Sequence, residues 1–404
     1  MGFLTSVHER LGAAARALLI AILCSSTANA RNPAQGQSDA ACGSKLSHFD
    51  RELLLESTSE TSANVSIGDL TGNGNLDIVL AKGRHWPLLS QVLLNDGHGR
   101  FPTTHALGDK PYRSYSAVLA DIDGGGFLDV VVGNDAPDPK VVYLNDGKGH
   151  FRFGSTFGHS DWPTRNVVVA DLNGDGLSDI VVANRYGSDH GGSNYVCLNR
   201  GHGRFDADCI AFSHESATTI TAADFNGDGF VDLAVPNRDG GQSYVYLNDG
   251  TANFTKRIPF GPSDATIRVA AAADLTGTGR MDIVAIDEQR RGASIYFNRP
   301  DGTFSAAISL GAGDAIPYAL AVGDLRRNGK SDIVVGYVRA PSMVYFNDGT
   351  GRSFTPVPFG DGKGTAYGIA IGDLDKDGWP DIAVARSDAP NAVYFSSGAR
   401  DCEK

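Results

Sequence analysis

Short apolar runs alternate with polar, glycine-rich turns along most of the chain. Runs of four or five residues that are rich in valine and isoleucine, as in 167–170 and 180–183, are typical of strands buried on both faces. Asn-Asp-Gly and similar turns separate many of these runs and favour hairpins. These runs and turns predict an all-β protein. The 50 glycines show no period of three, which excludes collagen.

One pattern is repeated seven times. Each copy begins with an aspartate, continues through a glycine-containing loop, reaches a second aspartate and ends in an apolar run. The copies align without gaps over residues 68–81, 120–133, 170–183, 223–236, 273–286, 323–336 and 372–385. Successive copies are 49 to 53 residues apart, and a period near fifty is typical of propellers and other arrays.

A second pattern lies between these copies and consists of a Val-Tyr-Leu-Asn-like run, a turn and a phenylalanine. Six copies contain this phenylalanine, at Phe101, Phe151, Phe205, Phe254, Phe304 and Phe354. The seventh copy, 393–401, breaks off before it, and a comparable Phe49 begins the N-terminal stretch. Each unit therefore predicts four short strands, and we expect the N-terminal strand to complete the last unit.

Seven units of four strands predict a seven-bladed β-propeller, closed by pairing of its N- and C-terminal segments. An open solenoid is the alternative architecture. It requires distinct capping units at its ends, and the sequence contains no such units.

The first 30 residues have the features of a secretory signal. A basic start precedes the apolar stretch 17–24, and Ala30 closes a small-x-small cleavage site. The apolar stretch is too short to span a bilayer, so we expect cleavage near Ala30 and a secreted or periplasmic protein. Residues 31–41 then form a short linker, and 42–402 form one propeller domain. The net charge of −12 makes nucleic acid a poor partner.

Four cysteines remain after this cleavage. An even number in an exported chain suggests two disulfides, for which three pairings are possible. Cys197 and Cys209 flank a short glycine-rich turn, and Cys42 and Cys402 lie at opposite ends of the mature chain. The favoured pairing is therefore Cys42 with Cys402 and Cys197 with Cys209, provided that the termini meet.

The aspartate loops with their following Ile-Val-Val runs resemble FG-GAP, or VCBS-type, repeats over residues 46–398. This resemblance implies a propeller like the heads of integrin alpha-subunits, with calcium in the loops. It leaves the ligand open, because such propellers include adhesion heads, lectins and accessory parts of polysaccharide lyases.

Positions 1, 3, 5, 7 and 9 of the loops predict calcium sites. Calcium takes about six to eight oxygen ligands, and a glycine at position 6 permits the sharp turn that gathers them. Three loops have complete sets, with a backbone carbonyl at position 7: Asp171, Asn173, Asp175, Leu177 and Asp179; Asp224, Asn226, Asp228, Phe230 and Asp232; and Asp373, Asp375, Asp377, Trp379 and Asp381. Ordinary Asx turns are the alternative for any single loop, but three complete sets at one repeat position favour metal.

Three other loops have poorer sets of oxygen ligands. They are Asp121, Asp123 and Asp129; Asp69, Thr71, Asn73 and Asp77; and Asp274, Thr276, Thr278 and Asp282. In the sixth loop Arg326 stands at position 3, and we expect no metal there, because its guanidinium can pair with Asp324 or Asp332. The expected role of calcium is structural, since clustered carboxylates repel one another until a cation neutralises them.

Arginines recur shortly after the second strand of six units, some with aromatic residues beside them, on the face expected to lie opposite the aspartate loops. The candidate ligand-binding residues are Arg84, Trp86, Arg185, Tyr186, Arg238, Arg339 and Arg386, and the other loops of that face add Tyr112, Arg113, Trp162, Arg165, Arg268, Tyr318 and Tyr367. Aromatic rings stack on sugars, and arginines bind carboxylate or sulfate. We therefore predict a carbohydrate or glycan-bearing ligand, neutral or anionic. The alternative is that the arginines only pair with acids of the blades, such as Asp189, Asp239 or Glu288, and stiffen the loops.

Two other function classes compete with a monomeric, calcium-stabilised carbohydrate-binding module. For an enzyme, the sequence has no HExxH, GxSxG or Walker motif. His190 near Arg185 is the one combination that suggests a polysaccharide lyase-like activity. The third class is a protein-adhesion scaffold, for which no inserted metal-dependent domain is present.

Overall fold

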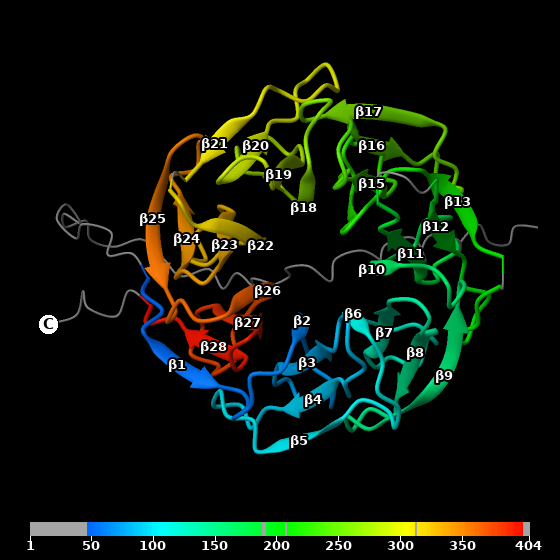
Figure 1. The fold of residues 1–404 in the computed structure, drawn as a ribbon, viewed down its shortest axis with the longest axis vertical. Coiled ribbons are helices and arrows are strands. Elements are labelled where there is room, and N and C mark those ends of the chain that lie inside the picture. The colour runs from blue at the N-terminus through cyan, green and yellow to red at the C-terminus, as the bar shows by residue number, and fades with distance from the viewer. Residues whose placement is uncertain (1–46, 188–190, 207, 312, 399–404) are drawn as a thin grey trace, which may run out of the picture.

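The computed structural model describes residues 47–187, 191–206, 208–311 and 313–398, whose regular structure consists of strands β1 to β28. These strands form a ring around a central axis (Figure 1). Five sheets have four strands each, and a sixth sheet has eight. The eight-stranded sheet consists of two four-stranded units joined by one residue pair, Val338 with Thr365. The all-β propeller with four-stranded blades is thus confirmed, and the described strands form seven such units.

Each blade runs from the axis outwards in four antiparallel strands. The inner strands are β2 (Ser62–Gly68), β6 (Ser114–Ala120), β10 (Thr164–Ala170), β14 (Thr221–Ala223), β18 (Ile267–Ala273), β22 (Ile316–Gly323) and β26 (Thr365–Gly372). The second strands are β3 (Asp77–Lys82), β7 (Asp129–Asn134), β11 (Asp179–Asn184), β15 (Asp232–Val235), β19 (Asp282–Asp287), β23 (Asp332–Val338) and β27 (Asp381–Ser387).

The outer half of each blade consists of the remaining strands. The third strands are β4 (Gln91–Leu94), β8 (Lys140–Asn145), β12 (Asn194–Cys197), β16 (Ser243–Leu247), β20 (Ala293–Tyr296), β24 (Ser342–Asn347) and β28 (Ala392–Phe395). The outermost strands are β5 (Thr103–Ala106), β9 (Phe151–Phe157), β13 (Ile210–Ser213), β17 (Lys256–Phe260), β21 (Ile308–Leu310), β25 (Phe354–Phe359) and β1 (Arg51–Leu54).

The second strands carry the continuous apolar runs of the sequence, and their residues are buried throughout, as in β7 and β11. A run of valines and isoleucines suits this position because neighbouring blades cover both faces of the strand. Near the axis the blades approach closely. A Cβ atom added to Gly368 would lie 2.8 Å from the Cα of Asn64, so only glycine allows β26 and β2 to meet as they do.

The ring closes by pairing of the two ends of the described chain. β1 is antiparallel to β28, with Arg51 opposite Phe395 and Leu54 opposite Ala392. The N-terminal strand therefore completes the blade formed by β26 to β28, as the sequence predicts (Figure 1). Cys42 and Cys402, which we expect to join the same ends, lie outside the described residues.

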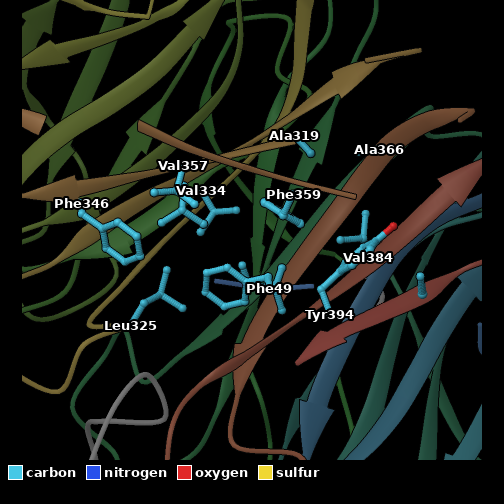
Figure 2. Packing of buried hydrophobic residues seen from close by; sticks show 13 residues of the cluster. Phe49, Ala319, Leu325, Val334, Phe346, Val357, Phe359, Ala366, Val384 and Tyr394 are labelled. Atoms are coloured by element: carbon cyan, nitrogen blue, oxygen red, sulfur yellow. The ribbon is translucent and has the colours of Figure 1, made fainter. Parts of the chain in front are cut away.

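The hydrophobic core is divided into seven clusters, each formed between two neighbouring blades. Every cluster contains one repeat phenylalanine, and the cluster between the last two blades contains Phe49. Figure 2 shows Phe49 among side chains of both blades, including Phe346, Phe359 and Tyr394. Its ring centroid lies 5.8 Å from that of Phe359. Phe49 thus fills the place that the seventh repeat leaves open.

Candidate functional site

Each aspartate loop connects an inner strand to the second strand of the same blade. In all seven loops the N–H of the glycine at position 6 donates to Oδ2 of the first aspartate, over 2.6–2.9 Å. These glycines have φ between 75° and 93°, a region that disfavours other residues. The loop therefore wraps around its first carboxylate, in the manner expected for a cation-binding loop.

The closing aspartate at position 9 has a structural role that sequence reasoning missed. In the third loop, Oδ2 of Asp179 accepts the N–H of Leu172, and Oδ1 accepts the N–H of Asn199 beyond the third strand. The other closing aspartates accept the equivalent bond at Oδ1. Burial raises the pKa of Asp129, Asp179 and Asp232 to about 6 and that of Asp381 to about 7. A buried carboxylate of this kind is stabilised as an anion by a nearby cation.

An asparagine after or at the end of the third strand links neighbouring blades. Nδ2 of Asn248 donates to the carbonyl of Leu172, which is at position 2 of the preceding blade's loop, over 2.8 Å. Equivalent bonds are made by Asn95, Asn145, Asn199, Asn298 and Asn347. The last blade has Ser396 at this position, which has no amide to donate. Six asparagines at one repeat position were a detectable signal, but the sequence analysis took them as turn residues.

Two loops bring three carboxylates close together. Asp373, Asp375 and Asp377 offer oxygen atoms within 4.8 Å of one another, and so do Asp121, Asp123 and Asp129. The seventh loop has a complete predicted set, whereas the second was expected to be poorer because Gly125 stands at position 5. Asp381, the closing residue of the seventh loop, is not part of its group.

The side chains of the seventh loop fit a hard cation. Oδ1 of Asp373 is buried and has no hydrogen-bond partner among the described residues. Burial, and then the charges of Asp377 and Asp375, raise the pKa of Asp373. An unpartnered buried oxygen beside two further carboxylates is the donor set that Ca²⁺ prefers. In the first loop, Oγ1 of Thr71 is likewise buried and unpartnered.

The third and fourth loops have complete sets whose side chains bond to one another. Nδ2 of Asn173 donates to Asp175 over 2.9 Å, and Nδ2 of Asn226 donates to Asp228 over 2.7 Å. The position-7 residues Leu177, Phe230 and Trp379 donate their N–H to the position-5 carboxylate of the same loop. In the fifth loop, the hydroxyls of Thr276 and Thr278 are 3.0 Å apart, beside Asp274 and Asp282.

The sixth loop holds a guanidinium where the others offer oxygen. Nη2 of Arg326 lies 2.9 Å from Oδ1 of Asp332 and donates to the carbonyl of Asn347 over 2.5 Å. Of the two acids considered from the sequence, Asp332 is thus the partner. The fixed positive charge takes the role that we assign to a cation elsewhere.

A cavity of about 500 Å³ lies on the propeller axis. Residues of all seven inner strands or the segments leading into them line it, together with Arg84, His85, Arg185 and Arg238 from loops after the second strands. Thr164 pairs with Asn184 at this end of the blade, whereas Ala170 pairs with Asp179 beside the aspartate loop. The cavity and the aspartate loops therefore lie at opposite ends of the same strands, separated by about 20 Å at the usual rise per residue.

The wall of this cavity is built by a β-bulge that recurs in six inner strands. The pairing register shifts at the residue six positions before the first aspartate. The residues at this position are Ala63, Tyr115, Arg165, Arg268, Tyr318 and Tyr367. In the fourth blade, whose inner strand β14 is shorter, Thr218 takes this position. A bulge re-aims a side chain and often lies beside a functional site. The bulges thus direct tyrosine and arginine side chains to the axis.

The cavity contains five arginines in a protein of net charge −12. Arg185 pairs with Asp239 at 2.7 Å, and Arg165 pairs with Asp135. Arg238 and Arg268 share Glu288, at 2.5 and 3.2 Å. Among the described residues, three carboxylates therefore pair with four of the five guanidiniums, and Arg84 forms no ion pair.

The tyrosines pack against these arginines. Arg268 lies 3.2 Å from the ring centroid of Tyr318, and Arg84 lies 3.8 Å from that of Tyr367. The hydroxyl of Tyr367 donates to that of Tyr318 over 3.3 Å. At the rim, the Tyr115 hydroxyl is 3.2 Å from Nδ1 of His85. Of these residues, Tyr115 and His85 were not predicted from the sequence as ligand-binding residues.

The predicted ligand-binding residues separate into two groups. Arg84, Arg185 and Arg238 line the cavity, and Trp86, Tyr186, Arg339 and Arg386 do not. Trp86 is 70% exposed. Arg386 is buried, and its guanidinium pairs with Asp361 at 2.8 Å and with Glu52 at 3.6 Å. The alternative of a pairing role is thus supported for Arg386, and also for Arg185 and Arg238, which pair with the expected acids Asp239 and Glu288. His190 of the lyase-like combination lies outside the described residues.

Two further observations concern the environment of the protein. A disulfide joins Cys197 and Cys209, as predicted. Within the described ranges no helix has the length and apolarity needed to cross a membrane.

Comparisons with known proteins agree with this architecture. No curated protein matches the chain significantly. A lectin of Agrocybe aegerita, described as recognising non-reducing terminal N-acetylglucosamine, has 23% identity and a TM-score of 0.52, and the match covers 74% of this chain and 80% of the lectin. A chain from the complex of BBS1N with ARL6DN, soaked with lead, has 14% identity and a TM-score of 0.59, with coverages of 86% and 96%. Both similarities concern the fold.

The repeat itself defines the family. The family model described as FG-GAP-like repeat matches six overlapping stretches: 69–132, 121–182, 172–235, 224–285, 274–335 and 327–384. Together they span most of the propeller, and each includes the aspartate loop and following strand that carry the geometry described above. The chain belongs to the FG-GAP-like repeat proteins.

Proposed function

We propose that this protein is an exported, calcium-stabilised propeller that binds a carbohydrate ligand in its axial cavity. The observation that carries the proposal is the ring of bulge residues, which places Tyr115, Tyr318 and Tyr367 beside arginines in one cavity. The similarity to a sugar-binding lectin supports the ligand class. Cleavage near Ala30 and a domain over 42–402 remain part of this proposal.

The cavity has the size and lining that a sugar needs. About 500 Å³ lies within the range of roughly 300–1,000 Å³ that is typical of small-ligand sites. Tyrosine supplies an apolar ring with a polar tip, and sugars present apolar faces edged by hydroxyls. Ion-paired arginines such as Arg185 and Arg238 are held rigidly, which fixes donors in place before the ligand arrives.

Calcium has a structural role in this proposal. Each inner strand leads into an aspartate loop at one end, and six of the seven carry a bulge residue near the other. Ordering of the loop therefore orders the strand that positions the cavity wall. The orphaned Oδ1 of Asp373 supports a cation in the seventh loop.

A cavity-filling variant tests the carbohydrate site. Thr218 lines the cavity and is only partly buried, so Thr218→Trp should block ligand entry without opening the core. We expect wild type to bind at least one class of glycan on an array, with Thr218→Trp losing that binding. The matched control is Thr103→Trp on the exposed outermost strand β5, which should bind like wild type. Equal binding by all three proteins would remove the cavity from the proposal.

A second candidate function, β-elimination on an acidic polysaccharide, is favoured by the contact between His85 and Tyr115. Burial, and then the charges of Arg84 and Arg165, lower the pKa of His85, so the imidazole is neutral and able to accept a proton at pH 7. His85 would take the proton next to the sugar carboxylate. The C–O bond would break as the C=C bond forms, and Tyr115 would protonate the leaving oxygen.

Elimination creates a conjugated double bond that absorbs ultraviolet light. Incubation with acidic polysaccharides should raise this absorbance, and Tyr115→Phe should suppress the rise. No absorbance change with any acidic polysaccharide, under conditions in which the protein binds it, would leave the binding module as the function.

A further inference from the structure

The strongest unexplained feature of the molecule is the excess of positive charge on its axis. The chain is acidic overall, at −12, yet its axial cavity gathers Arg84, Arg165, Arg185, Arg238 and Arg268. Their ion pairs within the described residues involve only Asp135, Asp239 and Glu288. Uncompensated charge in a partly dry cavity is costly unless a ligand of opposite charge occupies it.

Of the five arginines that line the cavity, Arg84 has the most unused bonding capacity. Among the described residues it forms no ion pair, and its Nε is buried without a hydrogen-bond partner. Its backbone is left-handed, with φ of 52°, a conformation that is uncommon outside glycine, asparagine and aspartate. The preceding Gly83 has no room for a side chain, because an added Cβ would lie 2.4 Å from the carbonyl oxygen of Trp86. The fold thus holds Arg84 in an unfavourable conformation at the axis.

The aromatic rings keep this guanidinium in position without neutralising it. Arg84 lies 3.8 Å from the Tyr367 ring centroid and 5.6 Å from that of Tyr115. Cation–π contacts leave the N–H groups at the edge of the guanidinium free to donate. A planar fork of donors held between two rings is suited to bind a carboxylate or sulfate in two hydrogen bonds.

Arg268 supports the same conclusion from the opposite part of the ring. It is 6% exposed, donates to the Tyr318 carbonyl over 3.1 Å and shares Glu288 with Arg238. Two guanidiniums on one carboxylate leave a net positive charge beside the cavity.

We infer that the axial cavity binds one acidic group per molecule, a carboxylate or sulfate on the carbohydrate ligand, with Arg84 as its principal partner. This inference rests on the proposed carbohydrate-binding function and specifies its ligand class. Each bulge residue occurs once on the shared axis, so the stoichiometry is one, not one per blade.

Isothermal titration with matched sugars tests this inference. The probes are an oligogalacturonate, its neutral oligogalactose counterpart, and a galactose oligomer with and without sulfate. We expect the acidic members to bind at least about tenfold more tightly, with one site per chain and with affinity that falls as salt rises. The two acidic arms distinguish carboxylate from sulfate as the preferred group.

Two variants and one control assign the site. Arg84→Gln should lose at least about tenfold in affinity for the acidic probe and little for the neutral one. Arg352→Gln removes an exposed arginine remote from the cavity lining and should bind like wild type. If Arg84→Gln does not fold, Thr218→Glu provides the second test, because a carboxylate placed in the cavity should compete with the acidic probe.

The outcomes separate the inference from the proposed function. Equal affinity for acidic and neutral sugars, unchanged by Arg84→Gln, would overturn the acidic-group inference and leave carbohydrate binding intact. If no oligosaccharide binds but free sulfate or acetate binds one-to-one and this binding is lost in Arg84→Gln, the anion site is supported and carbohydrate binding is not. No binding of any anionic probe would overturn the inference.

Discussion

Removal of calcium is the perturbation that tests the loops most directly. In the seventh loop three carboxylates lie within 4.8 Å of one another, and Oδ1 of Asp373 is buried without a partner. Without a cation, this arrangement leaves like charges close together and an oxygen unsatisfied, and both effects destabilise the folded state. We therefore expect EDTA to lower the melting temperature and excess calcium to restore it.

The size of the shift follows from the size of the domain. A site filled at 100 times its Kd stabilises the folded state by about 2.7 kcal/mol. The described residues number about 350, and at about 2.1 cal/mol/K per residue the unfolding entropy is about 0.7 kcal/mol/K. One calcium ion should thus raise Tm by about 4 °C, and the three complete loops together by about 11 °C.

Differential scanning calorimetry of loop variants, with and without calcium, tests the predicted rise in Tm per calcium ion. Asp377→Asn should remove one site's share, about 4 °C, of the calcium-dependent rise. The control is Asp324→Asn in the sixth loop, where the Arg326–Asp332 pair replaces the cation. Asp324 also accepts the N–H groups of Asn328 and Gly329, so its substitution changes stability by itself. The measured quantity is therefore the difference between the calcium and EDTA melts, which Asp324→Asn should leave unchanged. Melts that coincide with and without calcium, or equal losses in both variants, would refute the reasoning.

Three other predictions concern pH, the ring closure and the disulfide. In EDTA, Tm should fall as pH rises from about 4 to about 7. The pKa of Asp381 is raised to about 7, so the folded state binds more protons than the unfolded chain in this window. With calcium the fall should disappear, and a Tm in EDTA that does not change with pH would contradict this prediction. Phe49→Ala should lower the free energy of unfolding in urea by about 3–5 kcal/mol. Phe153→Ala, at a side chain that is 60% exposed, should change it little. Similar losses in both variants would contradict a role of Phe49 in closing the ring. Reduction of Cys197–Cys209, which are separated by 12 residues, should lower the unfolding free energy by about 3 kcal/mol, and an unchanged urea midpoint would contradict a stabilising role.

The repeated units predicted most of the fold because blade geometry depends on local pattern. The apolar runs identified the strands, and the missing phenylalanine of the last unit identified Phe49 as its replacement. Both are properties of side-chain volume and spacing, which the sequence records directly. The Cys197–Cys209 disulfide followed for the same reason, because its two residues flank one turn.

The sites were harder to predict because they depend on contacts between blades. Arg84 follows its closing aspartate by seven residues and lies in the loop after β3, whereas Arg386 follows its own by five and lies within β27. Arg386 is bound there by Asp361 and Glu52, acids of other segments that a repeat alignment does not reveal. The bulges that turn Tyr115 and Arg268 inward change the register by one residue, and an uninterrupted apolar pattern gives no sign of them.

The substitution of Ser396 for the repeat asparagine has a consequence for engineering. At every other junction between blades, an asparagine amide binds a loop carbonyl of the preceding blade. New chain ends made there by circular permutation would put that bond at risk. At the junction of the sixth and seventh blades that bond is not available to lose, and Arg327 of one loop instead reaches the Gly378 carbonyl of the next. The same junction carries the Val338–Thr365 pair that joins the two blades into one sheet, so a repeat unit inserted there would break a backbone pair between blades instead of an asparagine bond.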